Sequence, residues 1–115
     1  MSKNKELANH ITEMLQSIGP VSSRAMFGGH GFFLDGLMFG LLAFNTLYFK
    51  ADKESLNDFK EEGLEPFGYN KNGKIITMSY YQAPEEALES IEVMQTWANK
   101  AYAAALRSGK KTKQR

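Results

Sequence analysis

The sequence contains no cysteine, and it has only three prolines and one tryptophan in 115 residues. The absence of cysteine excludes disulfides, thiolate nucleophiles and cysteine-ligated zinc, and it fits a reducing compartment. No apolar run approaches the ~20 residues that a membrane span needs. The first residues, MSKNKELANH, have no apolar stretch behind their lysines, so we expect neither a signal peptide nor a membrane anchor. These absences predict a cytoplasmic protein.

An excess of charge of one sign is also missing, because the formal net charge is only +1. The charges are unevenly distributed, however. The last nine residues, RSGKKTKQR, hold five of the 14 basic residues and none of the 13 acidic ones, which leaves nine against 13, or −4, for residues 1–106. The length and the 43% hydrophobic content predict a single domain with one core. We therefore expect a globular domain over residues 1–107 and a basic, flexible tail over residues 108–115.

Helical periodicity occurs at both ends of the chain. In the first stretch the apolar residues recur at steps of three, four and one, as on one face of a helix; they are Leu7, Ile11, Met14, Leu15 and Ile18. Gly19 and Pro20 predict the end of this helix. Pro84, followed by two glutamates, predicts the start of a second long helix, whose apolar stripe runs from Leu88 to Leu106 and which we expect to end at Gly109.

Turn signals separate short apolar runs between these helices. Asp35-Gly36 and Asn72-Gly73 are typical of two-residue hairpin turns, and Asn45-Thr46 predicts another turn. The strands predicted before position 52 are Ala25 to Leu34, Leu37 to Phe44, and Leu47 to Ala51. A short helix capped by Asp52 follows, and then a hairpin whose return strand is Lys74 to Tyr81. This order, α-β(3)-α-β(2)-α, predicts a two-layer α+β domain, an antiparallel sheet with helices packed on it.

The glycine-rich segment RAMFGGHGFFLDGLMFG does not fit a nucleotide-binding loop. Such a loop needs a helix after the glycines, whereas here another strand follows and no GK[ST] sequence is present. We expect Gly28, Gly29 and Gly31 to allow a bulge or a sharp bend in the first strand. No cofactor is predicted.

Residues for metal binding or catalysis are not grouped in the sequence. His10 and His30 are far apart, and neither an HExxH motif nor a Cys/His cluster is present, so we expect no metal. The carboxylates fall at helix ends, and no serine stands in a nucleophile-elbow motif. Tyr80 and Tyr81 are neighbours on a strand and must face opposite sides of the sheet. We therefore expect no enzymatic activity.

The strand LMFGLLAF is apolar on both faces. Strict alternation places Leu37, Phe39, Leu41 and Ala43 on one face and Met38, Leu42 and Phe44 on the other. An antiparallel sheet with one solvated face would alternate with polar residues instead. We expect one of the helices to cover the second face, and the alternative is a partner subunit in a homodimer.

The segments RAMFGGHGFFLDGLMFGLL, LYFKAD, PFGY, MSYYQAPEE and WANKAYAAA follow one another in an order that resembles the TfoX N-terminal domain family from about Ser17 to Leu106. The resemblance implies the α-β(3)-α-β(2)-α fold and a role in bacterial competence. It also implies a non-enzymatic transcription coactivator that works with a protein partner, the catabolite activator protein. The competence regulators carry a second, helical domain for which these 115 residues leave no room, so a stand-alone N-terminal domain is expected.

We expect protein–protein interaction to be the mode of action. The candidate partner-binding residues are Arg24, Phe27, Gly28, Gly29, His30, Tyr80 and Tyr81. Arg24 matches an arginine of the family pattern, and we expect it to pair with an acid such as Asp35 or Asp52, with contact to a partner as the alternative.

Two other functions remain open at this point. The basic tail could hold nucleic acid weakly and without sequence specificity through phosphate contacts; its candidate residues are Lys110, Lys111, Lys113 and Arg115. A small-molecule site, or an enzyme's pocket, between the sheet and the last helix near Tyr80 and Trp97 is the third interpretation.

Overall fold

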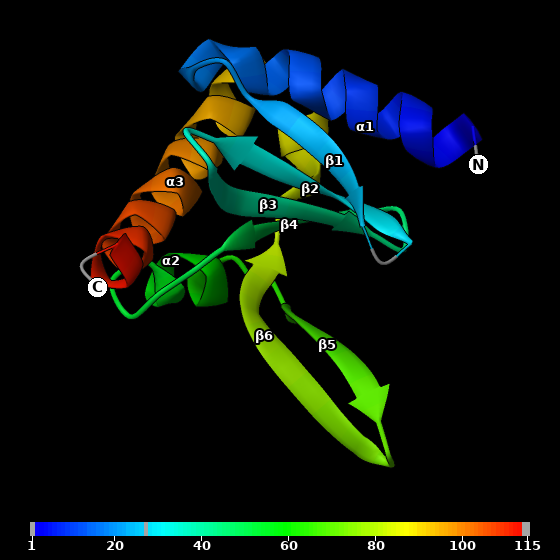
Figure 1. The fold of residues 1–115 in the computed structure, drawn as a ribbon, viewed down its shortest axis with the longest axis vertical. Helices are drawn as coiled ribbons and strands as arrows, with labels where there is room; N and C mark the ends of the chain where they lie inside the picture. Colours follow the sequence, from blue (N-terminus) through cyan, green and yellow to red (C-terminus); the bar gives the residue numbers. More distant parts are fainter. Residues whose placement is uncertain (1, 27, 114–115) are drawn as a thin grey trace.

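The computed structural model describes residues 2–26 and 28–113. Over this range the elements are α1 (Ser2–Leu15), η1 (Gln16–Ile18), β1 (Ser22–Met26), β2 (Gly29–Leu34), β3 (Leu37–Ala43), β4 (Thr46–Lys50), α2 (Leu56–Glu61), β5 (Pro66–Lys71), β6 (Lys74–Gln82), η2 (Glu85–Leu88) and α3 (Ile91–Lys113). The described strands form one antiparallel sheet in the order β1-β2-β3-β4-β6-β5 (Figure 1). The α+β class is confirmed.

The first predicted strand is in fact two strands. β1 and β2 pair antiparallel, with Met26 opposite Gly29, so the chain reverses completely where the sequence predicted only a bulge or a bend. Gly28 has a φ of +78°, a conformation that costs little only for glycine. Phe27 lies outside the described residues. Over the described range the order is therefore α-β(4)-α-β(2)-α rather than α-β(3)-α-β(2)-α.

The other hairpin turns follow the local signals closely. Asp35-Gly36 and Asn72-Gly73 join their strands as predicted, and all four residues have positive φ, as a type I′ turn requires. The turn between β3 and β4 uses Phe44 and Asn45, at φ +53° and +59°, one residue earlier than predicted.

The long helices differ from the prediction at two ends. The chain forms a short 3₁₀ turn, η2, after Pro84, and α3 begins only after Ser90, whose Oγ accepts the backbone N–H of Val93 at 3.2 Å. At its other end α3 continues to Lys113, so the helix end predicted at Gly109 is wrong. Lysines follow this glycine, and their helix propensity offsets part of its cost of about 1 kcal/mol. Gln114 and Arg115 lie outside the described residues.

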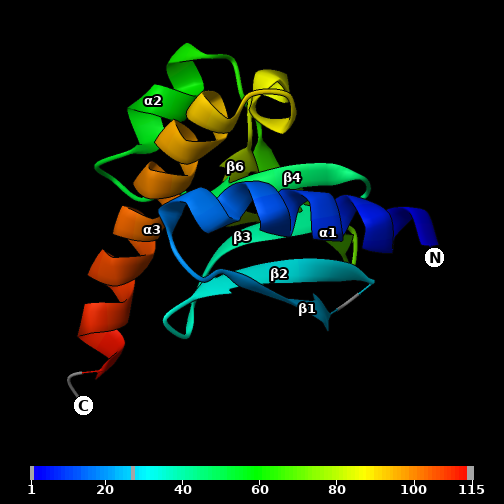
Figure 2. The same cartoon turned by 90° about the horizontal axis from the view of Figure 1, so that it is seen from above.

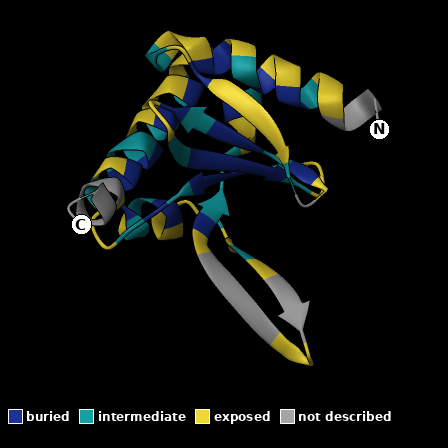
Figure 3. Cartoon of the chain, in the orientation of Figure 1, coloured by how far each residue is buried: buried dark blue, intermediate teal, exposed yellow. Residues whose placement is uncertain are grey.

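The helices pack on one face of the sheet and enclose the main core. α1 and α3 both lie against this face (Figure 2), and the buried side of α1 is turned toward the strands (Figure 3). The largest fully buried side chains are Phe32, Phe39, Phe49, Phe59, Ile11, Leu15, Leu42 and Met94. Alanines let α3 approach the strands closely; those fully or almost fully buried are Ala98, Ala101, Ala104 and Ala105.

Candidate functional site: the open face of the sheet

The other face of the sheet carries a second, smaller hydrophobic cluster. We call it the outer cluster, and its members are Leu41, Tyr48 and Tyr80, which are buried, and Met38, Ala43 and Phe67, which are partly buried. All of them come from β3, β4, β5 and β6, and no described helix contributes to it. The expectation that a helix covers the second face is therefore wrong. We refer to this side of the sheet as the open face.

A β-bulge decides which residues of β3 reach the open face. The β2–β3 register shifts between Phe32 and Phe33, so that Phe32 pairs with Gly40 while Phe33 pairs with Met38. The extra residue, Phe39, interrupts strict alternation. As a result Leu41 is on the open face and Leu42 is in the main core, opposite to the predicted assignment of faces in the second half of the strand.

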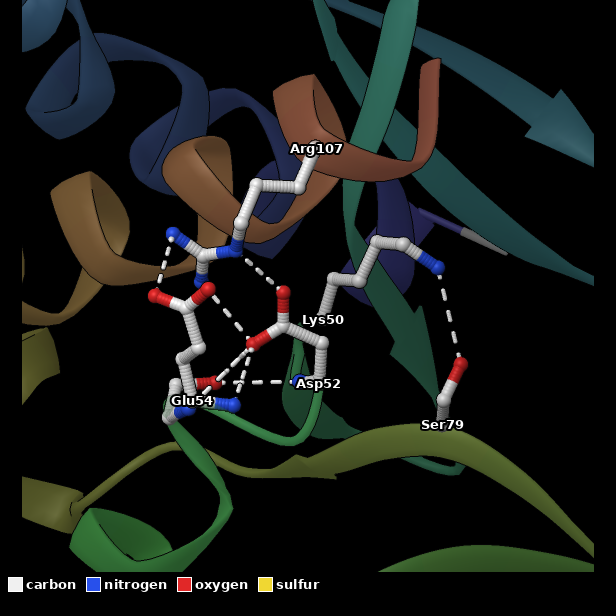
Figure 4. Close-up of polar contacts among 6 residues, drawn as sticks. Lys50, Asp52, Glu54, Ser79 and Arg107 are labelled. Atoms are coloured by element: carbon white, nitrogen blue, oxygen red, sulfur yellow. Dashed lines mark hydrogen bonds and ion pairs between the residues drawn. The ribbon is translucent and has the colours of Figure 1, made fainter. Parts of the chain in front are cut away.

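Tyr80 lies across the outer cluster and links β6 to β3. Its hydroxyl donates to the carbonyl oxygen of Met38 at 3.3 Å. Burial raises the pKa of Tyr80 from 10.0 to about 12, so the phenol remains a hydrogen-bond donor well above neutral pH. The Nζ atom of Lys50 lies 5.3 Å from the centre of the Tyr80 ring and 3.5 Å from the Ser79 hydroxyl oxygen (Figure 4). This lysine is thereby placed on the open face beside the aromatic ring.

Phe44 is the most conspicuous residue at the end of the outer cluster. It is 80% exposed although it is aromatic, and its φ of +53° is one that bulky residues rarely adopt. Its ring stacks on Phe67 with centroids 6.3 Å apart, and Phe67 meets Tyr48 edge to face at 4.9 Å. Phe44 thus extends the outer cluster into solvent. Sequence reasoning missed it, although an aromatic residue beside Asn45 in a tight turn was a usable signal.

Arg24 occupies the opposite side of the open face, on β1. Its guanidinium carbon lies 4.6 Å from the centre of the Phe33 ring, in a cation–π contact. The expected pairing with Asp35 or Asp52 is wrong. Asp35 accepts the Tyr102 hydroxyl at 2.8 Å, and Asp52 binds a different arginine. Arg24 is exposed and carries no ion pair with the described acids.

Gly31 connects these two sides of the open face. It pairs with Arg24 on β1 and with Leu41 on β3, which places the three residues in one row across the sheet. A Cβ atom at Gly31 would lie only 3.0 Å from the sulfur of Met26 and 3.2 Å from that of Met38. The side chains of Met26, Phe33 and Met38 therefore close over this glycine.

The charges of the molecule are segregated between the sheet and the rest. In the described part of the chain the strands contain four basic residues, Arg24, Lys50, Lys71 and Lys74, and no Asp or Glu. Outside the strands, residues 1–106 hold five basic and 13 acidic residues, a net charge of −8. The sheet is therefore a basic layer inside an acidic domain.

The structure divides the predicted partner-binding residues between the two faces. Arg24 and Tyr80 share the open face. Tyr81 faces the main core, with its ring centre 5.6 Å from that of Phe59. His30 pairs with Leu42 and so lies on the same side as the main core, where its Nδ1 atom is buried and has no hydrogen-bond partner among the described residues.

The predicted glycines have structural reasons for being glycine. Gly28 supplies the positive φ of the β1–β2 turn. At Gly29 a Cβ atom would lie 2.1 Å from the carbonyl oxygen of Leu42, so the close approach of β2 to β3 requires glycine there. A role of these glycines in binding a partner remains a prediction.

The backbone of the predicted nucleic-acid-binding lysines, Lys110, Lys111 and Lys113, belongs to α3, whereas Arg115 lies outside the described residues. That these residues bind nucleic acid remains a prediction.

A polar cluster at the end of β4 contains the shortest ion pair described. Arg107 of α3 holds both carboxylate oxygens of Asp52, at 2.5 and 2.9 Å, and lies 3.5 Å from Glu54 (Figure 4). The hydrogen bond from Arg107 is the main reason that the pKa of Asp52 falls to about 2. The Asp52 carboxylate also accepts the backbone N–H groups of Glu54 and Ser55. This cluster joins α3 to the loop before α2, and every contact in it is internal.

Neither a metal-ligand cluster nor a membrane-spanning helix is present in the described part of the chain. No group of three or more His, Cys, Asp or Glu side chains there is placed to hold a metal ion. Within the same residues, no helix combines the length and the apolar character needed to cross a bilayer.

The fold and the open face define a small two-layer α+β domain whose described helices all lie on one side of the sheet. The family model of the TfoX N-terminal domain matches residues 13–105, and the chain belongs to this family. It is similar to the DNA transformation protein TfoX1 of Aliivibrio fischeri (strain ATCC 700601 / ES114), with 33% identity over 88 residues that cover 72% of this chain and 42% of that protein. The chain thus spans less than half the length of this curated relative.

Proposed function

We propose that this domain takes part in competence-type regulation of gene expression, in the cytoplasm, and that it acts without catalysis by binding another protein with the open face of its sheet. Family membership and the similarity to a DNA transformation protein support the regulatory part of the proposal. Phe44 and the partly exposed members of the outer cluster, Met38, Ala43 and Phe67, support the binding part, because an exposed apolar patch is typical of an interaction site.

Phe44 is the single observation that favours this proposal most. An exposed aromatic side chain gains little from burial within its own domain, and its left-handed backbone costs about 1–2 kcal/mol. Asparagine or glycine would form the same turn at lower cost. Residues that are expensive for folding are concentrated at functional sites. Phe44 is therefore best explained as an anchor that becomes buried in a partner, as aromatic hot-spot residues do.

The experiment compares two exposed apolar residues, one beside the outer cluster and one at the start of α3. Phe44→Asn removes the proposed anchor, and Ile91→Asn, at a residue that is 56% exposed at the start of α3, is the matched control. In the source bacterium, a deletion strain is complemented with each variant, and transcripts of DNA-uptake genes are measured. We expect Phe44→Asn to lose the complementation and Ile91→Asn to retain it, at equal protein levels. Full complementation by Phe44→Asn would contradict the proposal.

A further inference from the structure

We propose that the partner presents an extended acidic segment with apolar side chains to the open face. This inference rests on the proposed function and specifies the chemistry of its partner. Its basis is the segregation of charge: the strands carry no acidic residue in the described chain, although the domain around them has a net charge of −8. Complementary potentials of this kind select partners and steer their approach.

Two cations are positioned on either side of the apolar centre of the open face. Arg24, Gly31, Leu41 and Tyr48 follow one another across β1, β2, β3 and β4, and Lys50 is two residues beyond Tyr48 on β4. With strands about 4.8 Å apart and a rise of about 3.3 Å per residue, Arg24 and Lys50 are separated by roughly 15 Å. An extended segment spans this distance with four or five residues, at about 3.3 Å each.

The contacts of Arg24 and Lys50 favour the binding of an acidic segment. Each lies against an aromatic ring, Arg24 at 4.6 Å from the centre of Phe33 and Lys50 at 5.3 Å from that of Tyr80. Neither takes part in an ion pair with the described acids. Both charged groups are therefore held in place and remain available for a carboxylate of the partner. Apolar side chains between those carboxylates would meet the partly exposed Met38 and Phe67, and a neighbouring one would meet Phe44.

Two other occupants fit the open face less well. A second copy of the chain placed face to face would bring Arg24 and Lys50 against the same cations, and like charges in an interface are costly. Single-stranded nucleic acid needs exposed rings for base stacking. Tyr48 and Tyr80 are only 9% and 6% exposed, so their ring faces are not available for stacking.

Peptide display against the purified full chain tests the inference. Random extended peptides are selected on the wild type, on the Arg24→Glu/Lys50→Glu double variant, on Phe44→Asn, and on the control Lys5→Glu, which changes an exposed lysine of α1. Thermal unfolding confirms that each variant is folded. The wild type and Lys5→Glu should enrich peptides with two acids four or five residues apart and apolar residues between them. The double variant should bind such peptides at least tenfold more weakly and should enrich basic peptides instead.

Each negative result of the peptide display contradicts a different part of the two proposals. Peptides that need Phe44 but bind the double variant equally well would overturn the acidic partner and leave the proposed function standing. If no peptide depends on Phe44, on Arg24 or on Lys50, both proposals fail. If oligothymidylate binds the wild type but not the double variant, and no acidic peptide is selected, the ligand of the open face is single-stranded nucleic acid and not a protein. If gel filtration shows a concentration-dependent dimer that Phe44→Asn abolishes, the ligand is a second copy of the chain.

Discussion

Replacing Gly29 by alanine tests the close approach of β2 to β3. The added Cβ would lie 2.1 Å from the carbonyl oxygen of Leu42, whereas ordinary contacts begin at 3.4 Å, so one strand must move by more than an ångström. The opposing atom is backbone within a paired strand and cannot rotate away. Overpacking of a core costs about 1–3 kcal/mol, and because the backbone cannot yield we expect about 3 kcal/mol here. This corresponds to a decrease in Tm of roughly 10–15 °C.

Two neighbouring glycines are the matched controls for this prediction. A Cβ atom at Gly28 would have no described atom within 4 Å beyond its chain neighbours, so Gly28→Ala retains only the cost of the φ of +78°, about 1 kcal/mol. Gly31→Ala would meet two methionine sulfur atoms at 3.0 and 3.2 Å and the edge of the Phe33 ring at 3.1 Å. These are side-chain atoms rather than backbone, and each has to shift by only a few tenths of an ångström. Urea titrations followed by circular dichroism give the free energy of unfolding of each variant. If Gly29→Ala is no less stable than Gly28→Ala, the packing argument is refuted.

Three further changes have predictable results. Phe59→Ala, at a fully buried ring 4.9 Å from the centre of Trp97, should lower the free energy of unfolding by about 3–5 kcal/mol in urea titrations. Phe44→Asn should leave it within about 1 kcal/mol of the wild type, because relief of the left-handed backbone, about 1–2 kcal/mol, offsets the lost stacking on Phe67, about 0.5–1.5 kcal/mol. Asp52→Asn should cost about 1 kcal/mol at neutral pH, where both side chains of the Arg107 pair are partly exposed and screened by solvent.

The Asp52 prediction includes a definite dependence on pH. The pKa of this carboxyl is lowered from 3.8 in the unfolded chain to about 2 in the folded domain, so its stabilising contribution is complete above about pH 4 and is lost as the pH falls toward 2. The difference in stability between the wild type and Asp52→Asn should therefore vanish over this interval. A difference that is constant from pH 7 to pH 2 would show that the ion pair is not its source.

For Phe44→Asn, a decrease of more than 2 kcal/mol in the free energy of unfolding would mean that Phe44 stabilises the fold.

Local signals in the sequence were sufficient for most of the elements. Asp-Gly and Asn-Gly prefer positive φ, so their turns and the paired strands beside them could be located without knowledge of distant residues. The steps of three and four in the apolar residues likewise located the first and last helices. The β1–β2 reversal was missed because Gly28, Gly29 and Gly31 were interpreted as a bulge or a bend within one strand.

The open face could not be predicted in the same way, because it depends on contacts between residues far apart in the chain. The bulge at Phe39 moved Leu41 to the open face, and a shift of one residue reverses every later side chain of a strand. Phe44 acquires its significance only when the β5–β6 hairpin brings Phe67 beside it.

The sequence by itself determined the α+β class, the hairpin turns, the long helices and the family, since these depend on local conformational preference and on an ordered set of motifs. The tertiary structure alone decided that the described helices share one side of the sheet. It also decided that Arg24 and Lys50 flank an apolar centre and that Arg107 forms an ion pair with Asp52, which lies 55 positions earlier in the chain. Such choices depend on which surfaces are buried together, and that is settled by packing over the whole domain rather than by any short segment.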